Sequence, residues 1–243
     1  MAVNAPHRTS VVRSLLPIRS EGLLDVGCGP LTAAYPYADK ARHVTCVDWN
    51  LMVFGSIPTN IEYLKGDFTQ IELEPNYYDC IIAADVFEHI ALEQEPAFAK
   101  KCVSVLRPGG HLVISVPHLG TFAFLDPYSV KPAIHRLLWQ LGLYKDVHNG
   151  NCDIRKGHKH YRVEQLIQSF KPLELLHIVY YGYFFDPLLT WAVALSRGSR
   201  QFPGYKWIEQ ACSRELERDY GQRSFNVALK FCKPTELAIA PAT

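Results

Sequence analysis

The sequence predicts an α/β fold built on a doubly wound, mainly parallel sheet, and three observations support this prediction. Short, β-branched, apolar runs alternate with helix-like stretches through the first two thirds of the 243 residues, which favours parallel pairing with right-handed crossovers. Each run is apolar at most positions, as expected for strands covered on both faces. Hydrophobic residues make up 48% of the chain, the usual share for a protein that buries a core.

The expected elements follow one another in a regular order. Strands are expected over residues 22–28, 43–49, 61–66, 78–84 and 111–117, with helix-like segments over 32–42, 51–57 and 93–106 between them. The last of these helices should stop at Arg107-Pro108-Gly109-Gly110, which then forms a turn. The remaining expected elements are a helix over 163–170, a strand over 173–181, helical structure over 187–218 and a final strand over 225–232.

We expect a single domain over residues 1–243, because about 150 residues form a typical domain and no repeat or linker divides the chain. Three segments should add to the sheet. They are an N-terminal helical extension over 1–20, an inserted lid over 118–160 and a helical insertion over 187–218 before the last strand. The lid region is rich in aromatic residues, His and Pro, and connections of this length usually have a function.

Charge and cysteine content restrict the partners and the compartment. Lys and Arg number 25 against 24 Asp and Glu, which removes the broad electrostatic reason to expect nucleic acid. The 7 cysteines form no CxxC motif, as expected for free thiols in a reducing compartment. The N-terminus has no continuous apolar segment, and Asp186 and Pro187 interrupt the apolar stretch 175–196. We therefore expect a cytoplasmic protein without a signal peptide or membrane span.

A glycine turn follows the first expected strand. Asp25, Gly27 and Gly29 belong to this turn, and a helix is expected after it. Glycines let the backbone approach a ligand closely, and a helix N-terminus offers free N–H groups. Thr32 stands where a dinucleotide-binding motif has its third glycine, which weighs against a nicotinamide cofactor.

Acidic residues end the next two expected strands. Asp48 follows the second strand, where a carboxylate can accept hydrogen bonds from both hydroxyls of a ribose. Asp67 follows the third strand and can accept a hydrogen bond from an exocyclic amine. Because ligands of such sheets bind at the carboxyl ends of parallel strands, these carboxylates indicate a nucleoside-binding edge.

Two further motifs follow in order: YDCII at 78–82 and LRPGG at 106–110. With these, residues 20–117 resemble the class I S-adenosylmethionine-dependent methyltransferases. The segment DVFEHI at 85–90 is similar to one in quinone-type O-methyltransferases and their relatives. The resemblance implies a Rossmann-like sheet of seven strands whose last strand is antiparallel, and S-adenosylmethionine as the cofactor.

The resemblance also implies which residues hold the cofactor. Asp25, Gly27 and Gly29 would line its methionine portion, and Asp48 would bind the ribose hydroxyls. The other implied contacts are with adenine, from Trp49, Asp67 and the backbone N–H of Phe68, and with the methionine end and the acceptor, from Ala84 and Asp85.

Methyl transfer to a hydroxyl needs a base, and three regions of the chain offer four histidines for this role. His89 follows Glu88 after the fourth strand, and His118 ends the fifth. His158 and His160 lie in the lid region. Each of these histidines could instead serve packing or hydrogen bonding to the backbone.

Two sets of residues could hold a metal, and we expect no metal at either. Asp85, Glu88 and His89 form a shortened version of the Glu-x-x-Glu-His pattern that binds a divalent cation such as Mg²⁺ in some quinone-type O-methyltransferases. Relatives without a metal carry the same Glu-His pair. The second set matches none of the usual zinc spacings and consists of His148, Cys152, His158, His160 and Tyr161.

The leading functional prediction is methyl transfer from S-adenosylmethionine to a small-molecule or lipid-linked acceptor, at an oxygen atom. The alternatives are a protein or RNA methyltransferase, a non-catalytic cofactor-binding scaffold and a nicotinamide oxidoreductase. Arg197, Arg200 and Lys206 follow an apolar helix, so residues 187–206 could lie on a membrane surface. A helix packed in the core is the competing interpretation of this segment.

Overall fold

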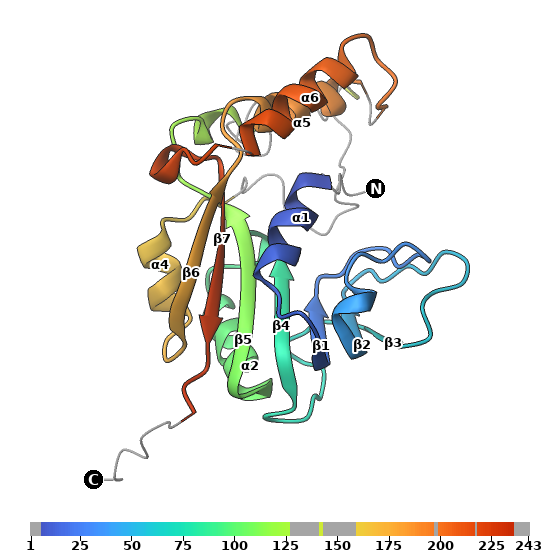
Figure 1. Ribbon diagram of the computed structural model, residues 1–243, viewed down its shortest axis with the longest axis vertical. Helices are drawn as coiled ribbons and strands as arrows, with labels where there is room; N and C mark the ends of the chain where they lie inside the picture. The colour runs from blue at the N-terminus through green and yellow to red at the C-terminus, as the bar shows by residue number, and fades with distance from the viewer. Residues whose placement is uncertain (1–5, 127–140, 143–158, 197–198, 217, 236–243) are drawn as a thin grey trace.

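The computed structural model describes residues 6–126, 141–142, 159–196, 199–216 and 218–235 of the chain (Figure 1). Its single seven-stranded sheet has the order β3-β2-β1-β4-β5-β7-β6. β7 pairs antiparallel with β5 and β6, and the other neighbours are parallel, which confirms the predicted fold class. The strands are β1 (Ser20–Val26), β2 (Ala41–Asp48), β3 (Ile61–Lys65), β4 (Tyr78–Ala84), β5 (Leu106–Pro117), β6 (Glu174–Tyr181) and β7 (Asn226–Cys232).

The central strands are buried on both faces, so neighbouring residues enter different cores. In β4, Ile81 packs into the core beneath α2 (Glu95–Val105) and α4 (Val163–Ser169), whereas Ile82 packs into the core beneath α1 (Pro6–Leu15). Figure 1 shows α1 on the face opposite to α2. This alternation follows from the two-residue period of a strand, and it explains why the runs are apolar at nearly every position.

The connections after β1 and β2 differ from the prediction. Helices were expected over 32–42 and 51–57, but the structure has only a short 3₁₀ turn there, Ala38–Lys40. Pro36 disfavours a helix in the first connection, and the backbone of Leu31 instead pairs with Val53 in an isolated parallel bridge. The expected helix directly after the glycine turn is therefore wrong, and α1 from the N-terminal extension covers this face of the sheet.

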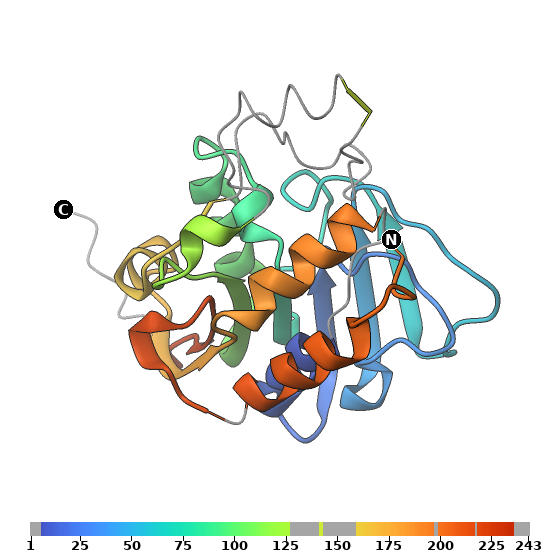
Figure 2. The ribbon, with the colours of Figure 1, turned by 90° about the horizontal axis from the view of Figure 1, so that it is seen from above.

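Two helices, α5 (Phe185–Leu195) and α6 (Tyr205–Leu216), lie between β6 and β7 in the sequence. Figures 1 and 2 show them side by side beyond the carboxyl ends of β4 and β5, and Leu189, Val193 and Cys212 form a small core between them. They therefore stand over the edge where ligands of such sheets bind. None of the helices in the described ranges is both long and apolar enough to cross a bilayer.

Candidate active site

The glycine turn after β1 brings the backbone close to the end of β2. Gly27 has φ +72°, and its N–H donates to the carbonyl of Val47 at 2.7 Å. A Cβ atom at this position would lie 2.1 Å from Cγ2 of Val86, so only glycine fits. Gly29 has φ +66° with open space around it, and its N–H donates to Oδ2 of Asp48 at 2.9 Å.

Asp25 lies beneath this turn and is 3% exposed. The hydroxyl of Tyr35 donates to its Oδ2 at 2.5 Å. Burial raises the pKa of Asp25 to about 7, and the nearby carboxylate of Asp48 also raises it, whereas the Tyr35 hydrogen bond lowers it. A cationic ligand beside this buried carboxylate would stabilise its ionised form. A buried acid with a pKa near neutrality is therefore a candidate contact for a positively charged ligand.

The other predicted cofactor residues line the same edge. Asp48 is partly buried, and its Oδ1 accepts from the N–H of Asn50 at 2.8 Å. Trp49 is 67% exposed, whereas Phe68 is buried. Asp67 accepts from the N–H and the hydroxyl of Thr69, both at 2.8 Å, which fixes the turn after β3.

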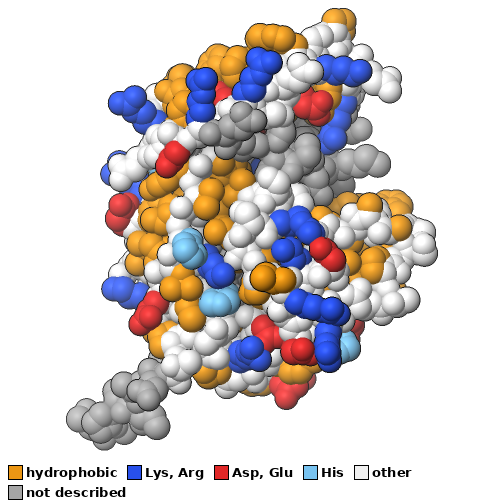
Figure 3. All heavy atoms as spheres, viewed as in Figure 1, with side chains coloured by type: hydrophobic (Ala, Val, Ile, Leu, Met, Phe, Trp, Pro, Cys, Tyr) orange, Lys and Arg blue, Asp and Glu red, His pale blue; other side chains and the backbone are white. Residues whose placement is uncertain are grey.

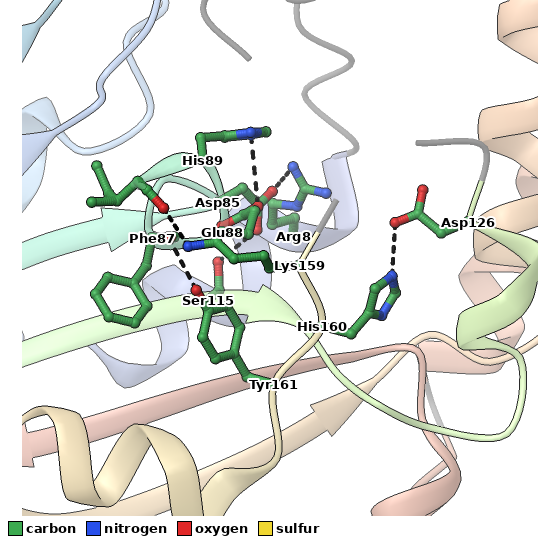
Figure 4. Close-up of polar contacts among 11 residues, drawn as sticks. Arg8, Asp85, Phe87, Glu88, His89, Ser115, Asp126, Lys159, His160 and Tyr161 are labelled. Atoms are coloured by element: carbon green, nitrogen blue, oxygen red, sulfur yellow. Dashed lines mark hydrogen bonds and ion pairs between the residues drawn. The ribbon is translucent and has the colours of Figure 1, made fainter. Parts of the chain in front are cut away.

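Asp85 follows β4 in a left-handed conformation, with φ +53°. Its N–H donates to the carbonyl of Ser115 at 2.9 Å, and its Oδ1 accepts from the Ser115 hydroxyl at 3.1 Å. Arg8 of α1 forms an ion pair with its Oδ2 (Figure 4). Side chains from α1, β4 and β5 thus meet where the methionine end of the cofactor and the acceptor are predicted.

Glu88 and His89 stand beside this ion pair, in the 3₁₀ turn Phe87–His89. Glu88 is 2% exposed, and its Oε1 lies 3.9 Å from Nε2 of His89. Among the residues that the structure describes, no group of three or more His, Cys, Asp or Glu side chains is arranged to hold a metal ion. The carboxylate of Asp85 is instead engaged by Arg8 and Ser115.

His118 and His160 form a second polar cluster with Asp126. His160 Nε2 lies 2.8 Å from Oδ2 of Asp126, and its Nδ1 lies 3.0 Å from the carbonyl of His118. Burial lowers the pKa of His160, but Asp126 and that carbonyl outweigh it and raise the pKa overall. As a base, His160 would first have to leave one of these two acceptors.

His118 itself is buried, and its Nδ1 lies 3.1 Å from the carbonyl of Ser224. Burial lowers its pKa, which favours the neutral ring at physiological pH. His158 lies outside the described residues, as do His148 and Cys152 of the zinc set and most of the predicted lid.

Comparison with known proteins shows what the sheet-forming part of this chain is similar to. Residues 24–114 match a family model described as a methyltransferase domain. The chain is 30% identical over 122 residues to a probable S-adenosylmethionine-dependent methyltransferase of Mycolicibacterium smegmatis, covering 48% of this chain and 47% of that protein. It is 27% identical over 136 residues to the ubiquinone biosynthesis O-methyltransferase of Marinobacter nauticus, covering 49% and 54%. Over residues 24–114 the chain is therefore similar to the methyltransferase domain of S-adenosylmethionine-dependent methyltransferases.

The chain matches about half the length of each of these two curated relatives. Among solved structures it resembles the [4+2]-cyclase SpnF, with a TM-score of 0.56 and 16% identity over 94% of this chain and 80% of that one. At this identity the likeness shows the fold alone, and the fold carries more than one chemistry.

The relative from Mycolicibacterium smegmatis is described as S-adenosylmethionine-dependent, and the residues at this edge of the sheet fit that cofactor. Nothing lies within 4 Å of the position that a Cβ atom would take at Gly29, so the turn presents open backbone to a ligand there. Asp25 offers a buried carboxylate to a cation, and Asp48 lies at the end of the neighbouring strand β2. These residues would hold the methionine portion and the ribose.

Several polar residues of the candidate site could not be found from the sequence. Arg8 lies in α1, before the first strand of the sheet, and belongs to no recognisable sequence motif. Asp186, at the start of α5, accepts from the amide of Asn226. Burial raises its pKa to about 6, and Arg8 acts in the opposite direction. The only sequence signal for Asp186 is a carboxylate within an apolar stretch.

The sequence also carries no sign that Lys159 and Tyr161 would contact the same carboxylate. Both engage Oε1 of Glu95, Lys159 by an ion pair and the Tyr161 hydroxyl at 2.7 Å. Lys159 also donates to the carbonyl of Ile90. The backbone of Tyr161 bridges to that of His118 after β5, so these contacts fix the end of the predicted lid against the segment that carries Glu88 and His89 (Figure 4).

Proposed function

We propose that this chain transfers a methyl group from S-adenosylmethionine to an oxygen atom of a small-molecule or lipid-linked acceptor. One observation carries the proposal: the glycine turn, Asp25 and Asp48 lie on the same sheet edge as Asp85, Glu88 and His89. A nucleoside-binding half and a half with acid and base groups are therefore adjacent. Similarity to the ubiquinone biosynthesis O-methyltransferase of Marinobacter nauticus supports an oxygen acceptor.

The bound cofactor supplies an electrophilic methyl group on a sulfonium. The chain's own residues bind and align, and alignment of reacting groups can lower a barrier by about 7–11 kcal/mol. Asp25 would face the cationic methionine end, and Asp48 would accept from the ribose hydroxyls. In this proposal Nδ1 of His89 takes the proton of the acceptor hydroxyl, and Glu88, 3.9 Å from Nε2, stabilises the resulting imidazolium.

A lipid-linked acceptor is supported by the surface over the site. Leu195 at the end of α5 is 74% exposed and Trp207 of α6 is 63% exposed. Lys206 and Arg200 are exposed beside them, and Figure 3 shows hydrophobic and basic side chains together over α5 and α6. Such a surface suits peripheral contact of residues 187–206 with anionic lipids, which the vesicle titration described below measures.

Calorimetric titration with S-adenosylmethionine tests the cofactor half. Asp48→Ala should weaken binding by roughly 10- to 100-fold, because it removes a charged acceptor of two hydrogen bonds. Asp39→Ala is the matched control, since Asp39 is an exposed aspartate that pairs with Arg13 away from the turn, and it should leave the affinity unchanged. Equal affinity in Asp48→Ala, or tighter binding of NADH, would overturn the proposal. Intact binding then justifies an acceptor screen with quinols, phenols and lipid extracts.

The affinity for S-adenosylmethionine should also depend on pH. The pKa of Asp25 is about 7 in the free chain, so protonation below this pH removes the negative charge that meets the cationic cofactor. We expect roughly tenfold weaker binding at about pH 5.5 than at about pH 7.5, measured calorimetrically. Asp25→Asn should bind weakly at both pH values. A wild-type affinity that is flat over this window would contradict the role of Asp25.

A further inference from the structure

A cavity of about 460 Å³ opens beside α6, outside the site described above. The side chains that matter here are Phe185, Trp207, Arg214, Glu215, Arg218 and Tyr220. None of them is a predicted cofactor or base residue. The cavity shares Phe185 with the start of α5, and the next residue, Asp186, faces Asn226 at the catalytic edge.

The negative charge of Glu215 is already engaged by the start of α5. Its carboxylate accepts from the backbone N–H groups of Tyr183, Phe184 and Phe185, at 3.1, 2.9 and 3.0 Å. Glu215 is 6% exposed, and its charge complements the partial positive charge of the α5 N-terminus. The Glu215 carboxylate therefore links α6 to the start of α5. It lies within ion-pair distance of neither arginine in the cavity.

Arg214 and Arg218 thus bring two positive charges to the cavity. Both side chains are exposed. Over the ranges that the structure describes, no carboxylate forms an ion pair with either guanidinium. Guanidinium groups have a planar fork of donors that matches phosphate and carboxylate oxygens. The cavity is therefore electropositive and can accommodate an anionic group such as phosphate or carboxylate.

Aromatic side chains form the other walls. Trp207 packs edge-on against Phe185, with ring centres 5.5 Å apart, yet it remains 63% exposed. Tyr220 stacks on Tyr183 at 4.3 Å, with the rings 5° from parallel. These contacts hold the rings in place and leave an apolar surface beside the two arginines. An exposed, immobilised tryptophan of this kind can pack against an aromatic or aliphatic body.

We infer that this cavity binds an amphiphilic anion, a phosphate group attached to an aromatic or aliphatic body. The phosphate would lie between Arg214 and Arg218, and the body against Trp207 and Phe185. A soluble phosphorylated compound and the headgroup of an anionic lipid share this chemistry. The inference does not depend on the proposed methyl transfer, because the cavity contains none of its residues.

Calorimetry with the full chain tests the inference, with phenyl phosphate as the probe and inorganic phosphate and benzyl alcohol as its two halves. Phenyl phosphate should bind more tightly than either half. The double variant Arg214→Gln/Arg218→Gln should weaken its binding at least roughly tenfold, and Trp207→Ala should weaken it as well. Arg19→Gln, an exposed arginine outside the cavity, is the matched control and should leave the affinity unchanged.

A vesicle titration separates the two sources of the phosphate group. If binding to phosphatidylcholine vesicles that contain phosphatidic acid is lost in the double variant, the natural ligand is a lipid headgroup. If the vesicles do not bind while phenyl phosphate does, the ligand is soluble. Absence of phenyl phosphate binding, or equal affinity in the double variant, would overturn the inference. Affinity for S-adenosylmethionine in the same variants should stay at the wild-type value, which separates this test from that of the methyl transfer.

Discussion

Replacing His89 with alanine is expected to lower kcat for methyl transfer by roughly 10²- to 10⁴-fold, the usual contribution of a general base. The affinity for S-adenosylmethionine should not change, because His89 follows β4 at the acceptor side of the site rather than at the glycine turn. Single-turnover methyl transfer to an acceptor found in the screen measures the chemical step, and calorimetry measures the binding. A loss confined to kcat would separate a catalytic role from a structural one.

The other histidines provide the comparison for this variant. Glu88→Gln should lower kcat less than His89→Ala, since it removes only the charge that stabilises the imidazolium. His177→Ala is the neutral control, because His177 is exposed on the edge strand β6. If His118→Ala or His160→Ala abolished turnover while His89→Ala retained it, the base would belong to the second polar cluster and the assignment to His89 would fail.

Gly27→Ala should destabilise the fold and abolish measurable binding of S-adenosylmethionine. The new Cβ would lie 2.1 Å from Cγ2 of Val86, at a φ of +72°. Strain at a left-handed backbone position and overpacking together cost about 2–5 kcal/mol. Urea denaturation measures this change in the free energy of unfolding, and calorimetry at a temperature where the variant is folded measures cofactor binding.

Gly29→Ala is the matched control for the clash. Gly29 has a similar φ of +66°, but nothing lies within 4 Å of the position its Cβ would take. We expect a loss of stability of about 1 kcal/mol, from backbone strain alone. The double variant Gly27→Ala/Val86→Ala should recover part of the loss seen in Gly27→Ala. If Gly27→Ala and Gly29→Ala lowered the free energy of unfolding equally, the contact with Val86 would not contribute to the effect.

Much of the fold could be predicted because the central strands carry a strong local signal. Ile81 and Ile82 enter different cores, so an unbroken apolar run leaves little choice other than a buried parallel strand. The segments after β1 and β2 carry no such signal. Their composition is compatible with a helix, but Pro36 and the bridge between Leu31 and Val53 decide against it. That bridge joins residues distant in sequence, which periodicity cannot reveal.

The two halves of the site differ in the same way. The cofactor half follows from sequence because Asp25, Gly27 and Asp48 each sit at the end of a recognisable strand. The acceptor half depends on residues that tertiary structure brings together, such as Arg8 with Asp85 and Asp186 with Asn226. Charge balance in a buried cluster is set by neighbours from other elements. Spacing along the chain therefore predicts a ligand-binding edge but not the groups that tertiary structure brings beside it.

The place of β7 in the sheet has a consequence for synthesis of the chain. β7 lies between β5 and β6, although it is the last strand to be made. A nascent polypeptide that has left the ribosome up to β6 therefore has one unpaired edge on β5 and two on β6. Unpaired edges are sites of aggregation, and β6 also exposes Leu176 and Ile178. The sheet can close only after Cys232 has been made, so we expect truncations between Tyr181 and Cys232 to lower the yield of soluble chain.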